Sequence, residues 1–83
     1  MKNKGIEVMR EYLDMMEYKV ISIDNDIVVT YDLEEGVQEE YDIEYWCHNI
    51  IEILQRQLRD KQDMGKKAIK QCEADIKILK SLC

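Results

Sequence analysis

The side chains that perform chemistry in enzymes and metal sites are few in this sequence and far apart. His48, the only histidine, stands beside Cys47, whereas Cys72 and Cys83 are distant from both. Zinc sites are generally built from closely spaced pairs of ligands, and adjacent residues on a helix point about 100° apart. The sequence therefore predicts no metal site, and we interpret the cysteines as small apolar side chains on a helix.

Motifs for nucleophilic catalysis and phosphate binding are also missing. Ser22 and Ser81 lie outside any glycine-rich elbow, and the three glycines are too widely spaced to form a phosphate-binding loop. Carboxylates are numerous, but in so small a protein we expect them to be exposed, without the burial that tunes a general acid. The sequence thus predicts no catalytic residue, no cofactor and no enzymatic activity.

Length and cysteine count limit the class of protein. Eighty-three residues predict one domain, with a core too small to be very stable on its own. There is no hydrophobic leader and no apolar run of about eighteen residues, so neither secretion nor a membrane span is predicted. Three cysteines, an odd number, argue against a disulfide scaffold. We therefore expect a cytoplasmic protein with reduced thiols.

Charge divides the chain into two unequal parts. Residues 1–47 hold thirteen acidic and four basic side chains, a balance of −9, and residues 48–83 hold five acidic and eight basic, a balance of +3. Between Asp24 and Glu44 there are nine carboxylates and neither Lys nor Arg. Such a surface repels nucleic acid and attracts basic surfaces, or it serves only to keep the protein soluble.

Hydrophobic periodicity predicts an α+β domain with an N-terminal helix, a three-stranded antiparallel β-meander and a long C-terminal helix. The first helix is expected from Gly5 to about Glu17, and the strands over residues 19–23, 27–33 and 37–41. One face of the first helix should pack against the sheet. That face comprises Ile6, Met9, Leu13 and Met16, with Tyr12 beside them.

Both turns of the meander are predicted to be three residues long. Residues 24–26 would form the first turn and pair Ile23 with Ile27. Residues 34–36 would form the second, with Gly36 in the left-handed backbone conformation. In this register the apolar side chains of the second strand point inward, and they are Ile27, Val29, Tyr31 and Leu33.

The last helix is predicted to begin at Asp42, which is placed to cap it, with Glu44 in the first turn where carboxylates suit the helix dipole. Its apolar stripe comprises Ile43, Trp46, Cys47, Ile50, Leu54 and Leu58.

Two structures compete over residues 59–67, which are polar and contain Gly65. Either the helix runs on through this glycine, which costs about 1 kcal/mol, or it ends there and a second helix turns back. Lys66 and Lys67 have the wrong charge for a helix N-terminus, so we favour the continuous helix.

A continuous helix of about forty residues would span about 60 Å, far more than a compact domain of this size. The chain would then have a core over residues 1–58 and a helical extension over residues 59–83. The exposed apolar stripe of the extension predicts a homodimer that pairs as a coiled coil. The residues assigned to this dimer are Leu58, Ile69, Cys72, Ile76, Leu79 and Cys83.

Two functions fit these features. The first is a non-enzymatic protein-interaction module, a homodimeric adaptor or regulatory protein. The second is an inhibitor whose acidic sheet imitates nucleic-acid phosphates and occupies a basic groove, since carboxylates two residues apart in a strand lie about 6.6–7 Å apart. In size, acidity and lack of catalytic motifs the chain is similar to small phage-encoded anti-defence proteins, including anti-CRISPR inhibitors. The residues assigned to the partner-binding acidic face are Asp32, Glu34, Glu35, Glu40, Asp42 and Glu44.

Direct binding to nucleic acid is not expected, although the C-terminal part carries a basic stripe. The acidic first half of the chain opposes a polyanion. No membrane partner is expected either. The basic stripe comprises Lys66, Lys67, Lys70, Lys77 and Lys80.

Overall fold

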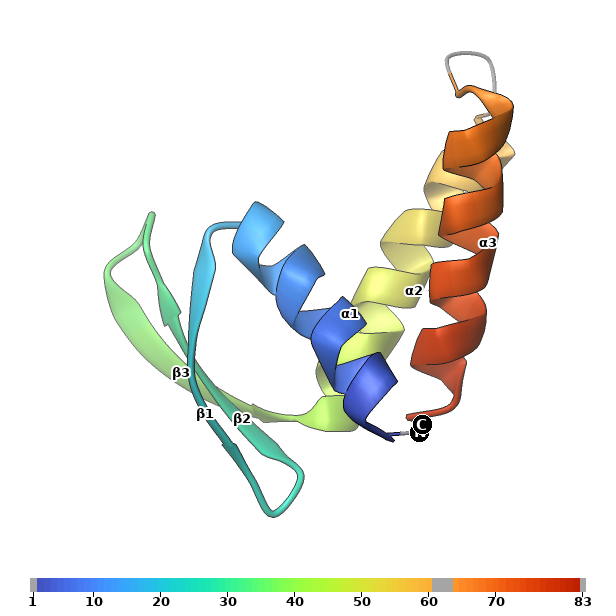
Figure 1. The fold of residues 1–83 in the computed structure, drawn as a ribbon. Coiled ribbons are helices and arrows are strands. Elements are labelled where there is room, and N and C mark those ends of the chain that lie inside the picture. Colours follow the sequence, from blue (N-terminus) through green and yellow to red (C-terminus); the bar gives the residue numbers. More distant parts are fainter. Residues whose placement is uncertain (1, 61–63, 83) are drawn as a thin grey trace.

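The structure, a computed structural model, describes residues 2–60 and 64–82. The elements are α1 (Lys2–Met15), β1 (Tyr18–Asp24), β2 (Ile27–Asp32), β3 (Val37–Asp42), α2 (Ile43–Arg59) and α3 (Lys66–Lys80). The predicted α+β order of helix, antiparallel meander and helical C-terminal part is confirmed. Figure 1 shows the sheet on one side of the molecule and the three helices on the other.

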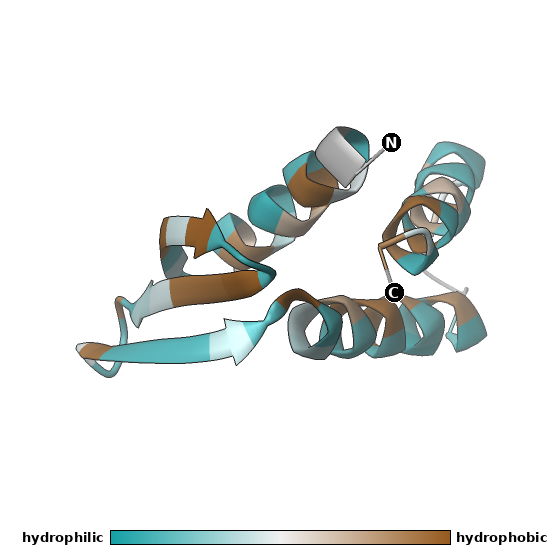
Figure 2. Cartoon of the chain, turned by 90° about the horizontal axis from the view of Figure 1, so that it is seen from below, coloured by the Kyte–Doolittle hydropathy of each residue, from teal (hydrophilic) through white to brown (hydrophobic). Residues whose placement is uncertain are grey.

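The hydrophobic core lies where the helices meet one another and one face of the sheet. Met9 and Leu13 of α1 are fully buried, as their spacing predicts, and the stripe on α2 is buried from Ile43 to Leu54. Figure 2 shows α1 above the sheet and no helix or strand of the described residues below it. Within the described residues, no helix combines the length and apolar composition that crossing a membrane requires.

The first turn has two residues, so the predicted three-residue turn is wrong. Asn25 and Asp26 have positive φ angles of 51° and 63°, as in the tight turn that matches the twist of a hairpin, and Asp24 pairs with Ile27. A carboxylate and an apolar side chain can lie opposite each other here because both are exposed at the end of the sheet. A β-bulge at Ile21 then shifts the register of β1 by one residue.

The second turn is one residue longer than predicted. Asp32 pairs with Val37, and its carboxylate accepts hydrogen bonds from the backbone N–H groups of Glu34 and Glu35 at 2.9 and 3.0 Å. Gly36 has a φ of 73°, which confirms its left-handed conformation. The turn therefore closes around the Asp32 side chain, which the apolar alternation of β2 did not reveal.

Each turn differs from its predicted length by one residue, and together they reverse the two faces of β2, because a shift of one residue moves every side chain to the other face. Val28 and Thr30 are fully buried against the helices, whereas Val29 and Tyr31 point away from them. The prediction that Ile27, Val29, Tyr31 and Leu33 face the core is therefore wrong; Leu33 lies in the turn after β2 and is 59% exposed.

The continuous helix through Gly65 is also wrong, and the alternative with a returning helix is the one observed. α2 ends at Arg59, and α3 begins at Lys66 after Gly65, which provides no side-chain cap. Burying an Ile or Leu side chain stabilises by about 1.5–3 kcal/mol, whereas a missing cap costs only about 1 kcal/mol. Packing therefore outweighs the weak start signal. The longest dimension of the molecule is 36 Å, and α3 does not project from it as an extended helix.

The stripe assigned to the dimer is buried within the chain itself. Cys72, Ile76 and Leu79 are 4, 8 and 0% exposed, and Leu58 packs against the same core. Ile69 is partly buried, and Cys83 lies outside the described residues. A second copy would have to displace α3 from its own core, so we do not assign dimerisation to these side chains.

Candidate interaction surface

The face of the sheet that points away from the helices is the open face. Antiparallel pairing aligns its side chains in rows, because residues directly opposite one another point to the same side. The rows are Asp24–Ile27–Asp42, Ser22–Val29–Glu40 and Lys19–Tyr31–Gln38. No helix or strand of the described residues covers this face (Figures 1 and 2).

The open face combines an apolar centre with flanking strands that carry Asp24, Glu40 and Asp42 and one basic residue, Lys19. Its central strand carries Ile27, which is 40% exposed, the partly buried Val29, and Tyr31, which is 37% exposed. Glu40 and Asp42 flank this strand on β3, where the structure places no basic residue. An apolar patch rimmed by polar side chains is one of the surface features that mark protein-binding sites.

The acidic residues predicted from the sequence do not form one patch. Glu40 lies on the open face, but Glu34 and Glu35 lie in the loop at one end of the sheet. Asp42 lies at the other end and caps α2 by accepting from the N–H of Tyr45 at 2.8 Å, which confirms the predicted cap.

The other two acidic residues have different surroundings. Glu44 is exposed in the first turn of α2, where the dipole favours a carboxylate. Asp32 is half-buried and is occupied by its own turn. Of the six residues, Glu40 and Asp42 alone belong to the open face.

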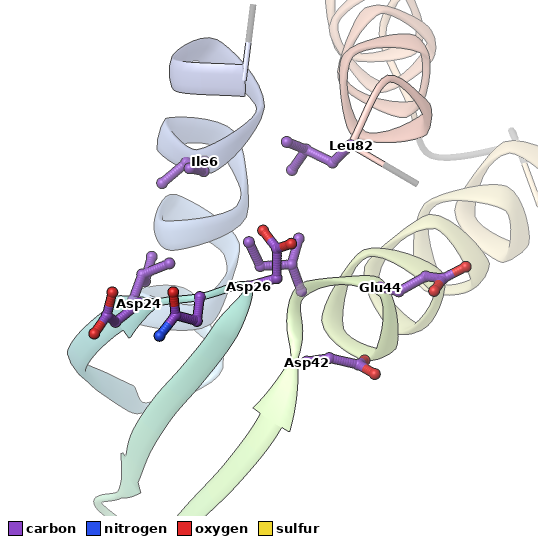
Figure 3. A pocket seen from close by; sticks show the side chains of 9 residues that line it. Ile6, Asp24, Asp26, Asp42, Glu44 and Leu82 are labelled. Carbon is purple, nitrogen blue, oxygen red and sulfur yellow. The ribbon is translucent and has the colours of Figure 1, made fainter.

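A pocket of about 460 Å³ opens at the Asp42 end of the sheet (Figure 3). It lies between α1, the β1–β2 turn, the start of α2 and the end of α3. Its carboxylates do not converge on a point, and the described residues contain no group of His, Cys, Asp or Glu that could hold a metal ion. The lining residues are Ile6, Ile23, Asp24, Asn25, Asp26, Asp42, Ile43, Glu44 and Leu82.

An aromatic cluster lies where β3 passes into α2. The rings of Tyr41 and Tyr45 stack with centroids 4.1 Å apart, and Trp46 meets both rings edge-on. The Tyr41 hydroxyl donates to Glu39 at 2.9 Å, and this hydrogen bond raises the pKa of Tyr41. Tyr45 is 41% exposed, so the cluster presents one accessible ring beside β3.

The outer edge of β3 presents unpaired backbone groups. The N–H of Ile43 donates to the C=O of Asp26 at 2.9 Å, which fixes the alternation of hydrogen bonds between β2 and β3. Glu39 therefore directs its N–H and C=O toward β2, whereas Gln38 and Glu40 direct theirs outward. Since the sheet order is β1-β2-β3, no strand of the described residues faces these outward groups.

The two cysteines that the structure describes are occupied in packing. The Cys72 thiol donates to the C=O of Leu54 at 3.5 Å, and burial raises its pKa, which disfavours the reactive thiolate. Cys47 is fully buried, whereas His48 beside it is exposed, so the two point apart. These positions agree with cysteines that act as small apolar side chains.

Two features of the surface were not predicted from the sequence. One is the pair Tyr41 and Tyr45, which are four residues apart but belong to a strand and a helix, so no single period relates them. The other is the open edge of β3. The order of the predicted meander contained that second signal, because the third strand of a meander has only one neighbour.

No protein-family model, curated protein or solved structure matches this chain. A fold class alone does not specify a function, because one architecture serves many unrelated functions. A function for this chain therefore rests on the open face and on the outer edge of β3.

Proposed function

We propose that this protein is a non-enzymatic interaction module that binds a basic surface of another protein through its open face. One observation carries the proposal: the helices cover a single face of the sheet, and the other exposes Ile27 and Tyr31 beside Glu40 and Asp42. Such a module would act as an adaptor or as a regulatory subunit.

The composition of the open face indicates what its partner must offer. Exposed ion pairs contribute at most about 1 kcal/mol each, so apolar side chains covering Ile27 and Tyr31 would supply most of the affinity. The carboxylates would accelerate encounter with a positively charged partner and exclude acidic ones. The partner is therefore a protein that presents apolar side chains among Lys or Arg.

Imitation of nucleic acid is the second candidate. It is favoured by the exposure of seven of the nine carboxylates between Asp24 and Glu44. A basic groove that evolved for phosphates would need these charges and would gain little from Tyr31. The two candidates therefore differ in what the removal of the Tyr31 ring should do.

Affinity capture from extracts of the source cell, with matched charge-reversal variants, tests the proposal. The first variant combines Glu40→Lys on the open face with Glu34→Lys and Glu35→Lys in the loop at one end of the sheet, and Glu40→Lys alone isolates the open face. The control combines three substitutions of exposed helix residues, with the same change in net charge. These are Glu7→Lys, Glu11→Lys and Glu73→Lys.

The wild type and the helix control should capture the same protein, and the sheet variant should lose it. Equal capture by the sheet variant and the helix control, or no specific capture by the wild type, would contradict the proposal. A fourth variant, Tyr31→Ser, separates the two candidates. The Tyr31→Ser variant should capture less of the partner if the partner packs on the open face, and the same amount if the carboxylates imitate phosphates.

A further inference from the structure

The two edges of the sheet differ in their ability to accept another strand. β1 contains the bulge at Ile21, which interrupts its register, and Lys19 nearby. Bulges and charged side chains, lysine above all, are the usual means by which edge strands avoid pairing. β3 has no bulge and no lysine, and its six residues pair with β2 without a register shift. Its charges are all carboxylates, which deter acidic strands but not basic ones. The edge of β3 is therefore the one that can be extended.

The charge of β3 selects the strand that can pair with it. Glu39, Glu40 and Asp42 give it three carboxylates within six residues. Two β3 strands from two copies would bring like charges together across the new pair, which destabilises such pairing. A strand carrying Lys or Arg at the matching positions would be attracted instead.

We propose that β3 receives, as a fourth strand, an extended basic segment of the partner protein. This inference rests on the proposed function and adds the mode of binding. The outward N–H and C=O groups of Gln38 and Glu40, with the N–H of Asp42, pair with the backbone of the segment. Strand addition of this kind draws affinity from main-chain hydrogen bonds and specificity from alternate side chains.

The two sides of the new strand have different neighbours. On the open face its side chains lie beside Glu40 and Asp42, which favours Lys or Arg at every second position. On the helix side they lie beside Val37, which is 48% exposed, and beside Tyr41 with its stacked neighbour Tyr45. The partly buried Glu39 lies between these two residues, and its carboxylate accepts the hydrogen bond from the Tyr41 hydroxyl. Apolar residues fit that side, so the segment alternates basic and apolar residues.

The exposed Tyr45 ring adds a second contact at the end of β3. A cation over the face of a tyrosine ring is attracted by its quadrupole. Tyr41 holds Tyr45 in place by stacking at 4.1 Å, so the ring does not have to be ordered on binding. A basic side chain of the segment beyond Asp42 can lie against this ring.

A synthetic peptide with four Lys-Val repeats and blocked termini is the probe for calorimetric titration. In either strand direction, the N–H groups of only one residue type, Lys or Val, face β3. Two further peptides are N-methylated on all internal Lys or on all internal Val residues, with charge unchanged. One methylated peptide should lose roughly tenfold or more in affinity and the other should bind as the parent does.

The matching change in the protein is Gln38→Pro, which removes an outward N–H without altering charge. Proline is tolerated on edge strands where the N–H faces solvent, and Gln38→Thr keeps the N–H as a control. Affinity for the parent peptide should fall roughly tenfold in the proline variant and change less than about twofold in the threonine variant. Circular dichroism establishes that both variants fold.

A second pair of variants covers the case in which Gln38→Pro does not fold. Glu40→Lys should weaken binding, and Glu73→Lys on α3, with the same change in net charge, should not. If both methylated peptides bind like the parent while Glu40→Lys weakens binding, strand addition is overturned and binding by the open face survives. Absence of saturable binding by the parent peptide also overturns strand addition, and the capture experiment then decides the proposed function separately.

Discussion

The hydroxyl of Tyr12 donates a hydrogen bond of 2.5 Å to the carboxylate of Asp75. These residues are 63 positions apart and join α1 to α3. Asp75 is only 7% exposed and also accepts from the side-chain amide of Gln71 at 2.8 Å. A buried carboxylate needs such partners, so this link fixes how α3 returns to the first helix.

Tyr12→Phe should reduce the free energy of unfolding at pH 7 by about 1–3 kcal/mol, because the Asp75 carboxylate would lose a partner while staying buried. Burial, and then the hydrogen bond to Asp75, raise the pKa of Tyr12 above its ordinary value near 10. The link therefore stabilises fully below about pH 10 and is lost as the pH rises further.

Denaturant titrations of the wild type and Tyr12→Phe at pH 7 and at pH 11 measure this effect. The difference in stability between the two proteins should narrow at the higher pH. A difference that stays constant would show that ionisation of Tyr12 is not linked to unfolding.

Thr30→Val should stabilise the protein by about 1 kcal/mol. Thr30 is fully buried, and its hydroxyl has no hydrogen-bond partner among the described residues. An unsatisfied buried hydroxyl costs about 1–3 kcal/mol, and valine keeps the branched shape that strands favour. Chemical denaturation measures the change, and Thr30→Ser, which keeps the hydroxyl but removes the methyl group, should destabilise. A stability loss in the valine variant would mean that the hydroxyl has a partner.

Leu79→Ala should destabilise the chain by about 2–5 kcal/mol, because Leu79 is fully buried in the chain's own core. Met15→Ala, at a residue 67% exposed, should change stability by less than about 0.5 kcal/mol.

Sedimentation of the wild type should give the 9.9 kDa monomer at all concentrations. A wild-type dimer that Leu79→Ala converts into a stable monomer would instead support the predicted coiled-coil pairing through this apolar stripe.

Amide hydrogen exchange should alternate along β3. The N–H groups of Gln38 and Glu40 point outward and should exchange rapidly, whereas those of Glu39 and Tyr41 are bonded to β2 and should be protected. Nuclear magnetic resonance resolves these residues individually. The reverse alternation would contradict the register on which the open face depends.

The sequence was sufficient to predict the structure where local signals and burial agree. The cap at Asp42 and the left-handed Gly36 follow from side-chain chemistry that acts within a few residues, and both are found. The α+β order and the buried stripe from Ile43 to Leu54 follow from periodicity, which the core enforces. These features required no knowledge of distant contacts.

The sequence was insufficient to predict the structure where contacts between distant residues determine it. The side chain of Asp32 closes a second turn that is one residue longer than predicted, the first turn is one residue shorter, and together they reverse the predicted faces of β2. Gly65 marks a helix start that lacks a side-chain cap, so packing of α3 determines the break. The structure therefore replaces the predicted line of carboxylates with the open face, which is both apolar and charged, and with the outer edge of β3.

The central claim is that a basic partner binds at the sheet, along the outer edge of β3. Titration of the isotopically labelled protein with the Lys-Val peptide, followed by amide chemical shifts, tests this claim most directly. The largest shifts should fall on residues 37–42 and on Tyr45, with slowed exchange at Gln38 and Glu40. Shifts confined to α1 or α3, or spread evenly over all exposed carboxylates, would contradict the claim.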